Sequence, residues 1–376
     1  MKDSLGSSNK QASIFFVGPL PPPVHGFAEI NRRMLVHLSK NADIEVFDVT
    51  PRKKSRGLFA KANSWLSLVL QFFKFTGLAL RGNGDVLYLP LSGGYRQFID
   101  ASFAIIGLLS GLRIFIHHHS FAYINHRPLY ARIVLRLLRN ATHIVLCERM
   151  GNLLSDSYRI SKDNIRVLSN AAFLDDAPHY NNKKVHDKKL VLGFLSNITA
   201  SKGCFEFIEL IKAATDKGLV VEGFMAGPVQ PEIDQPFSQA IASTKFVSHI
   251  GPVYGEAKHN FFEKIDVLVF PTQYENEAEP VTIWEALEAS VPVIALSRGC
   301  IECIVPENIG WVIKNPDHFI EQGLECLDYI LEDVSTLGTM KVEARKEFEK
   351  AKQKYTIHLE ALLLEIMNGK VNAKSI

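Results

Sequence analysis

Short apolar runs alternate with longer amphipathic stretches through the first half of the chain. The runs are rich in β-branched and aromatic side chains, which is typical of buried strands. We place these strands at residues 14–18, 44–49, 85–91, 113–116, 142–147 and 165–168. Amphipathic stretches between the strands predict helices, the first with Ile30, Met34 and Leu38 on one face. Strands that alternate with helices indicate an α/β domain around a parallel sheet.

A polar segment, residues 175–189 (DDAPHYNNKKVHDKK), separates this series from a second series of the same kind. The second set of predicted strands lies at residues 190–195, 220–226, 246–250, 267–270, 291–296 and 310–313. The repeated alternation predicts two doubly wound domains with a cleft between them. One more amphipathic helix is predicted over residues 348–367, with its apolar face formed by Tyr355, Leu359, Leu362, Leu363 and Ile366.

Length and charge narrow the class of protein. A chain of 376 residues suits two domains of ordinary size. Lysine plus arginine (42) nearly balance aspartate plus glutamate (40), so the net charge of +2 gives no reason to expect nucleic acid as a partner. The first thirteen residues lack the apolar region of a signal peptide, and residues 65–80 are too short and too polar to span a membrane. We therefore expect a cytoplasmic protein.

Residues 51–81 combine lysines and arginines with tryptophan, leucine and phenylalanine. A basic, aromatic and amphipathic stretch suits the surface of an anionic membrane. The same pattern is also typical of an ordinary helix that covers a sheet and keeps its lysines in solvent. The sequence leaves both interpretations open: peripheral membrane contact at the inner face, or a covering helix.

Histidines and cysteines do not form a convincing metal site. His117, His118 and His119 follow a predicted strand, but adjacent residues of an extended chain point to opposite sides, so at most two could converge. Cys300 and Cys303 form a C-x-x-C pair without a second ligand pair nearby. We predict no bound metal. A histidine at this strand end could serve as a hydrogen-bond donor or proton relay, or it could be a core residue.

Residues 270–296 (FPTQYENEAEPVTIWEALEASVPVIAL) carry the most informative pattern. A strand ends, an acidic loop follows, and a helix begins at about Val281. Open α/β sheets bind ligands at such positions, and the free N–H groups of a helix start favour an anion such as a diphosphate. Glu277 and Glu285 could accept hydrogen bonds from sugar or ribose hydroxyls. Alternatively, Thr282 and Glu285 form a capping box, and Glu277 is a solvated loop acid.

The first loop, residues 18–28 (GPLPPPVHGFA), is not a G-x-G-x-x-G dinucleotide fingerprint. Gly26 could let the backbone approach a ligand closely, or the loop could be a rigid connector.

The order and spacing of these marks resemble the group 1, or family 4, retaining glycosyltransferases, which have the GT-B fold: two Rossmann-like parallel-sheet domains that face a central cleft. The resemblance covers roughly residues 14–310. Its marks in the second half are Lys202-Gly203, Ala226-Gly227, Gly251, Asp266-Val267 with Pro271, the glutamates at 277 and 285, Val291-Pro292-Val293-Ile294 and Gly310. In the first half Gly26, His119 and Asn170 match the family's first-loop glycine, its strand-end histidine and the asparagine that closes the first domain.

The resemblance implies an N-terminal acceptor-side domain over residues 1–178 and a nucleotide-sugar domain over 186–350. It also implies that residues 351–376 form a helix that packs back toward the first domain. The donor would be bound without a metal or cofactor.

The family's functional positions carry over residue by residue. Glu285 looks like the ligand of the donor ribose, Glu277 like the glutamate near the transferred sugar, and Lys202 like the diphosphate cation. Pro280 and Val281 would meet the diphosphate at the helix start. Gly26 would lie under the donor phosphates and His119 would face the reaction centre.

Two positions depart from the family pattern. Asn197, with Ser196 before it, stands where many members have an arginine, so one positive charge for the phosphates is missing. Glu279, with Pro280 after it, replaces a common Phe-Gly and brings an extra acid near the diphosphate. We keep Asn197, Glu279 and Asn170 among the expected substrate-binding positions.

The resulting expectation is a metal-independent hexosyltransferase. It would move a sugar from a nucleoside-diphosphate sugar to a hydroxyl of a glycan or lipid-linked acceptor, with retention, in polysaccharide or glycolipid assembly. The alternatives are a sugar-nucleotide epimerase or phosphorylase on the same scaffold, and a non-catalytic nucleotide-sugar-binding protein.

Overall fold

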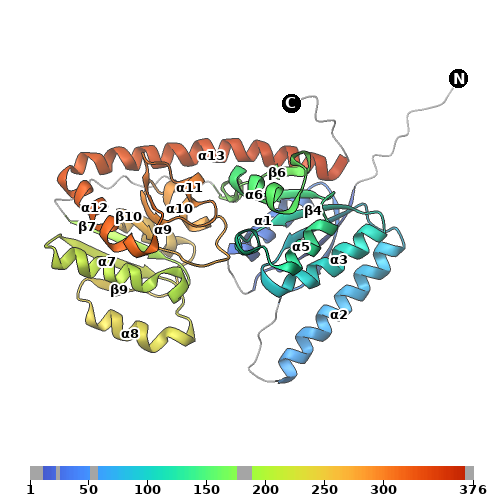
Figure 1. Cartoon of the computed structure of the whole chain (residues 1–376), viewed down its shortest axis with the longest axis horizontal. Helices are drawn as coiled ribbons and strands as arrows, with labels where there is room; N and C mark the ends of the chain where they lie inside the picture. The colour runs from blue at the N-terminus through green and yellow to red at the C-terminus, as the bar shows by residue number, and fades with distance from the viewer. Residues whose placement is uncertain (1–11, 23–25, 51–57, 176–188, 369–376) are drawn as a thin grey trace. The chain divides into compact units, whose positions relative to one another are not determined.

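The computed structural model describes residues 12–22, 26–50, 58–175 and 189–368 (Figure 1). Side chains within residues 58–64 and at position 334 are outside this description. The chain divides into two compact units. The first unit comprises residues 1–168 and 356–376, and the second comprises residues 169–355. The predicted polar linker lies almost entirely outside the described residues.

The first unit is built on a six-stranded sheet in the order β2-β1-β3-β4-β5-β6, and all of its strand pairs are parallel. The strands are β1 (Ser13–Gly18), β2 (Asp43–Asp48), β3 (Val86–Leu91), β4 (Arg113–His118), β5 (Thr142–Val145) and β6 (Ile165–Val167). Strands β1 and β3 are almost completely buried, as the apolar runs predicted.

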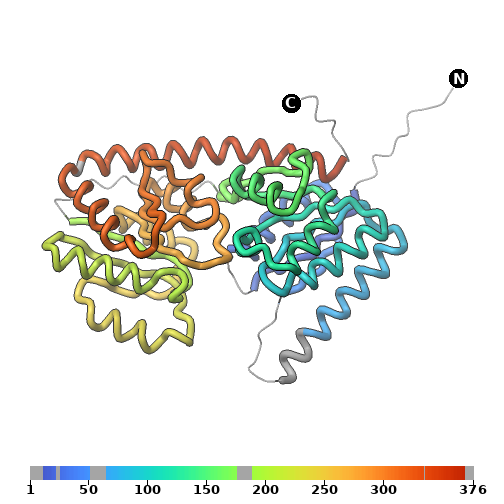
Figure 2. The backbone as a smooth tube through the Cα atoms, in the orientation of Figure 1, coloured from blue at the N-terminus to red at the C-terminus, as the bar shows by residue number. Residues whose placement is uncertain are grey.

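Helices connect the strands of this unit, whose described residues up to 168 are traced in blue to green in Figure 2. They are α1 (Gly26–Ser39), α2 (Leu58–Leu80), α3 (Gln97–Leu109), α4 (Ala122–His126), α5 (Leu129–Leu137) and α6 (Glu148–Tyr158), with short 3-10 turns η1 (Gly94–Arg96) and η2 (Lys162–Asn164). Aromatic rings join α2 to the sheet and to α3: Phe75 of α2 lies 5.5 Å from Phe15 of β1 and 5.2 Å from Phe103 of α3, measured between ring centroids.

The second unit repeats this design with a parallel sheet in the order β12-β11-β10-β7-β8-β9. Its strands are β7 (Leu190–Leu195), β8 (Val221–Ala226), β9 (Val247–His249), β10 (Val267–Phe270), β11 (Val293–Leu296) and β12 (Gly310–Ile313). Its helices are α7 (Cys204–Asp216), α8 (Asp234–Ser243), α9 (Glu256–Lys264), α10 (Val281–Glu288), α11 (Ile301–Ile304), α12 (Phe319–Glu332) and the first part of α13 (Val334–Asn368). Short 3-10 turns are η3 (Asn170–Phe173), η4 (Ala200–Lys202), η5 (Pro231–Ile233) and η6 (Pro316–His318).

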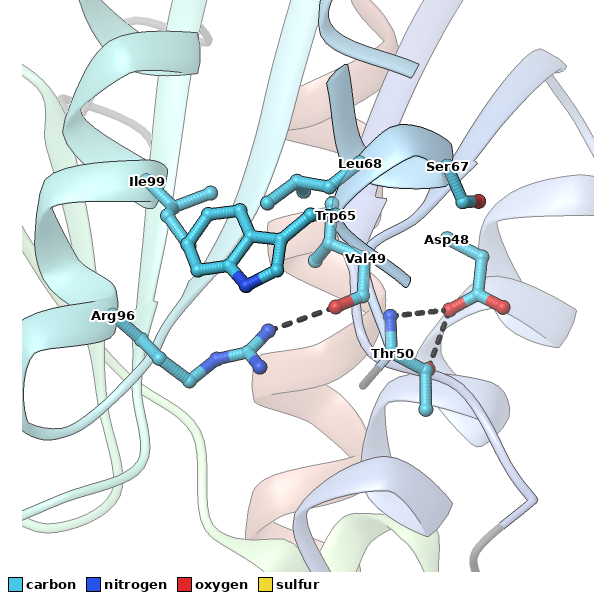
Figure 3. Close-up of a pocket in the computed structure, with 8 residues that line it drawn as sticks. All are labelled: Asp48, Val49, Thr50, Trp65, Ser67, Leu68, Arg96 and Ile99. Carbon is cyan, nitrogen blue, oxygen red and sulfur yellow. Dashed lines mark hydrogen bonds between the residues drawn. The ribbon is translucent and has the colours of Figure 1, made fainter. Parts of the chain in front are cut away.

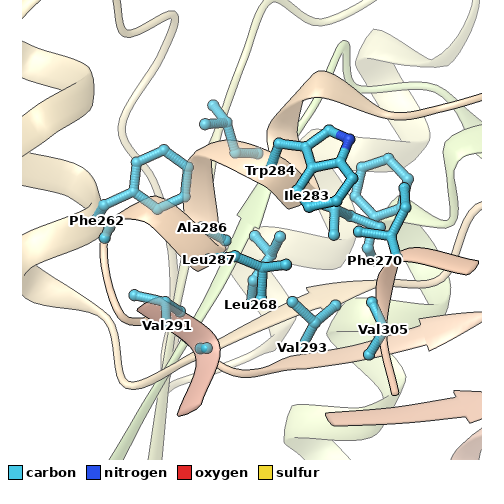
Figure 4. Close-up of a cluster of buried hydrophobic side chains, with 14 of the residues drawn as sticks. Phe262, Leu268, Phe270, Ile283, Trp284, Ala286, Leu287, Val291, Val293 and Val305 are labelled. Carbon is cyan, nitrogen blue, oxygen red and sulfur yellow. The ribbon is translucent and has the colours of Figure 1, made fainter. Parts of the chain in front are cut away.

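Both faces of this second sheet are buried. Leu268 and Phe270 of β10 belong to one apolar cluster, which includes Trp284 and Leu287 of α10 (Figure 4). The alternate residues of β10 belong to another cluster, which α7 and α12 complete. Because alternate side chains of a strand point to opposite faces, a continuous apolar run is what a doubly covered strand requires.

Helix α13 begins at Val334, well before the predicted start at residue 348. Residues 334–355 belong to the second unit and the remainder to the first. Within the first unit, Arg113 donates hydrogen bonds to the backbone carbonyls of Glu365 and Ile366, and His358 bonds to the carbonyl of Val167. None of the helices in the described residues has the length and apolar content that a membrane span needs.

Candidate active site

Lys202 and Glu277 are brought together by the parallel order of the second sheet. Strands β7 and β10 are parallel neighbours, so the segments that follow them meet at the carboxyl end of the sheet. Lys202 Nζ donates to Glu277 Oε2 at 2.5 Å, and Thr272 Oγ1 donates to the same oxygen at 3.2 Å. The ammonium also lies 4.6 Å from the centre of the Tyr274 ring. The lysine and glutamate side chains are 19% and 10% exposed, so the pair is largely sheltered from solvent.

Gly203 sets the position of Lys202. Its φ of +83° is in the left-handed region, and a Cβ built on it would lie 2.2 Å from the carbonyl oxygen of Pro271. The same two segments also share a backbone hydrogen bond, in which the Gln273 N–H donates to the Ser201 carbonyl at 2.8 Å. The turn after β7 therefore packs backbone against backbone on the loop after β10, which only glycine permits.

Helix α10 begins with an open end. Pro280 is its N-cap residue, and no side chain caps the first turn. The capping-box interpretation of Thr282 and Glu285 is therefore wrong, because Thr282 already lies inside the helix. Glu285 instead accepts a hydrogen bond from Lys258 of α9 at 2.6 Å. An uncapped helix start presents free backbone N–H groups and a positive dipole end, which suit an anion.

Glu279 is buried rather than directed to solvent. Its carboxylate accepts hydrogen bonds from Ser169 Oγ at 2.6 Å and from the Asn170 N–H at 2.5 Å. Asn170 Nδ2 returns a bond to the Glu279 carbonyl at 2.9 Å. Burial raises the pKa of Glu279 to about 7, although the bonds from Ser169 and Asn170 oppose that rise. The extra acid of the loop thus lies inside the protein with a largely neutral side chain below pH 7.

This burial predicts a pH-dependent stability that Glu279→Gln removes. The folded-state pKa lies above the value of 4.5 for an exposed glutamate, so the stabilisation is present below pH 4.5 and is lost as the pH rises to about 7. The free energy of unfolding of the wild type should fall by about 3 kcal/mol relative to the variant across this window. Urea unfolding of both proteins at several pH values measures this difference. A difference that stays constant with pH would contradict the assignment.

The remaining position predicted in this unit is more exposed. Asn197 lies on the surface between β7 and η4, and the next residue, Ile198, donates its N–H to the Pro228 carbonyl at 2.9 Å. Three neighbours of the site carried no signal in the sequence. Thr272, Tyr274 and Lys258 contact the predicted residues, but threonine, tyrosine and lysine at these spacings match no motif.

In the first unit, the three histidines alternate as an extended chain requires. The rings of His117 and His119 lie on one side of the chain, 4.0 Å apart, and His117 Nδ1 is 2.6 Å from the Tyr88 hydroxyl. His118 points to the other side, where it bonds to Tyr123 and His143. The prediction that at most two could converge is confirmed.

His119 keeps one ring nitrogen unused. Its Nε2 is buried and has no hydrogen-bond partner among the described residues. The same is true of Nε2 of His117. Burial lowers the pKa of His119 to about 3, so the imidazole is neutral at pH 7. Gly26 is the first residue of α1, exposed, with open space where a Cβ would be. Among the described residues, no three histidine, cysteine, aspartate or glutamate side chains gather as metal ligands.

Known structures share this architecture. A glycosyltransferase from Rickettsia africae aligns with a TM-score of 0.68 over 96% of this chain and 100% of that chain, at 14% identity. Anabaena HepE in complex with UDP aligns with the same score, over 94% and 99% of the two chains, at 16% identity. Two six-stranded parallel sheets with these neighbours define a GT-B-like fold.

Comparison of the amino-acid sequence with known proteins finds a relative and a matching protein family. The capsular polysaccharide biosynthesis glycosyltransferase CapM of Staphylococcus aureus is 24% identical over 327 residues, which cover 82% of each protein. Residues 176–354 match the family described as glycosyl transferases group 1, and this segment contains Lys202, Glu277 and Glu285. Residues 176–354 are thus a group 1 glycosyltransferase domain, and the likeness to CapM extends over 82% of the chain.

Proposed function

We propose that this enzyme transfers a sugar from a nucleoside-diphosphate sugar to a hydroxyl acceptor with retention of the anomeric configuration. The observation that carries the proposal is the Lys202–Glu277 pair beside the open start of α10, inside the segment that matches the family. A cation, free backbone N–H groups and a carboxylate at one sheet edge are the groups that a diphosphate and a sugar require.

Each group has a separate role in the proposed reaction. The bond between the anomeric carbon and the diphosphate oxygen breaks, a bond to the acceptor oxygen forms, and the proton of the acceptor hydroxyl passes to the leaving diphosphate. Lys202 and the start of α10, at Pro280 and Val281, stabilise the negative charge that develops on the leaving diphosphate. Glu277 accepts hydrogen bonds from the transferred sugar. When the donor binds, the Glu285 carboxylate gives up its hydrogen bond from Lys258 and accepts hydrogen bonds from the ribose hydroxyls.

The first unit and the acceptor complete the proposal. Gly26 would lie near the donor phosphates, and His119, with His117 as its competitor, would face the reacting sugar through its unused nitrogen. HepE is described with UDP and with UDP and glucose, and CapM with capsular polysaccharide biosynthesis. We therefore propose a UDP-sugar donor and a glycan or lipid-linked acceptor.

We also propose a peripheral position at the inner membrane face, through the stretch of residues 51–81. The part of this stretch whose side chains are described is helix α2 from Trp65 onward. Large apolar side chains on it are exposed, with Phe73 66% and Trp65 62% accessible. An acceptor held in a membrane would then be within reach of the enzyme.

Thermal unfolding in the presence of nucleoside diphosphates and their sugars tests the donor site. One nucleotide should raise the wild-type Tm by several degrees, since a ligand at 100 times its Kd adds about 2.7 kcal/mol. Glu285→Ala should abolish this rise, and Glu349→Ala, which removes an exposed ion-paired glutamate of the same unit, should keep it. No rise with any nucleotide would refute the donor assignment.

Product analysis separates the competing reactions. A glycosyltransferase needs an acceptor for rapid turnover. An epimerase would release nucleotide and free sugar without one, and a phosphorylase would depend on inorganic phosphate.

A further inference from the structure

The helices that follow β2, β3 and β4 expose an unusual amount of apolar surface. Helices α2, α3 and α5, with η1, carry more than half of the large apolar side chains that are exposed in the described residues. These side chains are Trp65, Leu66, Val69, Leu70, Phe73, Leu80, Tyr95, Phe98, Ile105, Leu108, Leu109, Leu129, Ile133 and Leu137. Soluble monomers rarely expose large contiguous apolar patches, and such patches mark interaction sites.

These helices form one surface, which we call the outer helix face and define as the exposed side chains of α2, η1, α3 and α5. Helix α2 packs on α3, where the Phe72 and Phe103 rings are 5.3 Å apart. Helix α3 packs on α5, where Phe98 lies 5.7 Å from Tyr130. Figure 1 shows the three helices in sequence along this unit, in blue to teal.

The part of the sequence that contains these helices is strongly basic. Between Asp48 and Glu148 the sequence holds thirteen lysines and arginines but only two acids, Asp85 and Asp100, while the whole chain is close to neutral at +2. Asp100 is buried and receives the N–H of Ser92, and Asp85 precedes β3, outside the three helices. The outer helix face therefore has no exposed acid in its described part.

Helix α5 shows how the two kinds of side chain are combined. Exposed Leu129, Ile133 and Leu137 alternate with exposed Arg132 and Arg136 along its outer side. Apolar side chains that enter the acyl boundary, with cations at the level of the headgroups, are the pattern of a helix at a membrane surface. Trp65, Tyr95 and Tyr130 add aromatic rings of the kind that lie at the headgroup level.

We propose that the outer helix face binds an anionic phospholipid bilayer, with α3 and α5 contributing alongside α2. The inference rests on the proposed peripheral role and extends it: the contact is a face of several helices, not one basic stretch, and the arginines of α5 make it selective for anionic lipid. A nucleic acid would match the cations but not the exposed leucine, isoleucine and phenylalanine side chains. A second copy of this face would bring cations against cations.

The test is vesicle flotation of the full chain, with phosphatidylglycerol mixed into phosphatidylcholine and with phosphatidylcholine alone. The wild type should float with the anionic vesicles, and added salt should weaken binding. Arg132→Gln with Arg136→Gln should reduce affinity on the order of 25-fold, from about fivefold for each cation near the surface. Leu70→Ser with Phe73→Ser should reduce it at least as much. The matched control, Tyr329→Ser with Val342→Ser, removes exposed apolar side chains of the second unit and should float as the wild type does.

Each outcome decides the proposal. Equal flotation with both kinds of vesicle, or no flotation, would overturn it. Loss of binding in the arginine variant with full binding in the leucine–phenylalanine variant would indicate a general polyanion site, such as one for nucleic acid. The nucleotide-induced rise in Tm, measured on the same variants, separates this failure from failure of the donor site, because none of the substituted residues lies there.

Discussion

Replacing Lys202 by alanine should lower kcat for sugar transfer by about 10²–10³-fold, the usual cost of removing one group that stabilises developing charge. The ammonium is held in place by Glu277, by the Tyr274 ring and by the glycine that follows it, so it is ready to meet a leaving diphosphate. The apparent KM for the donor should change less than kcat, because the diphosphate gains negative charge as its bond to the sugar breaks.

The control for this variant is Lys217→Ala. Lys217 is also paired with a carboxylate, that of Asp328, but lies at the far end of α7. Its loss should leave the rate within about twofold, because exposed ion pairs contribute little. A Lys202→Ala enzyme that retains the wild-type kcat would refute the assigned role. A rate that falls in both variants would point to instability rather than to chemistry.

Replacing Gly203 by alanine should destabilise the second unit by about 3 kcal/mol. Part of this cost is the left-handed backbone, about 1–2 kcal/mol, and the rest comes from forcing Cβ away from the Pro271 carbonyl. Gly218→Ala is a matched control, because its φ of +88° is similar but open space lies where its Cβ would be. It should show only the backbone cost.

Urea unfolding followed by tryptophan fluorescence measures both glycine variants. Trp284 and Trp311 both lie in the second unit, so their emission reports on the part of the chain that carries the substitutions. Equal destabilisation of the two variants would show that the contact with Pro271 carries no cost. The turn would then not need glycine for its close approach to the neighbouring loop.

The sequence predicted the fold well because the inner strands of these sheets are buried on both faces. Such strands require continuous apolar runs, and all twelve observed strands overlap a predicted run. One boundary was less accurate: residues 334–347 of α13 were not predicted, although Leu337, Met340 and Ala344 are buried at helical spacing. Polar residues and Gly338 stand between these apolar positions and weaken the signal.

The candidate site was predicted in its positions but not in its contacts. The strand–loop–helix pattern indicated where Glu277 and Glu285 would lie, and the family resemblance added Lys202. The partners of these residues depend on tertiary packing. Lys258 reaches Glu285 across 27 residues of sequence, and Ser169 reaches Glu279 across 110. No local pattern encodes such distances, so neither the ion pair at Glu285 nor the burial of Glu279 could be read from the sequence.

The first unit is discontinuous in sequence, and this affects how it forms during synthesis. Its sheet is complete at Val167, yet Arg113, Arg166 and the Val167 carbonyl are paired with residues 358–366 of α13. The ribosome must therefore make the whole second unit before those partners emerge. Domains generally fold in the order in which they are made. The first unit therefore keeps unpaired groups at Arg113, Arg166 and Val167 until the last part of α13 has been made.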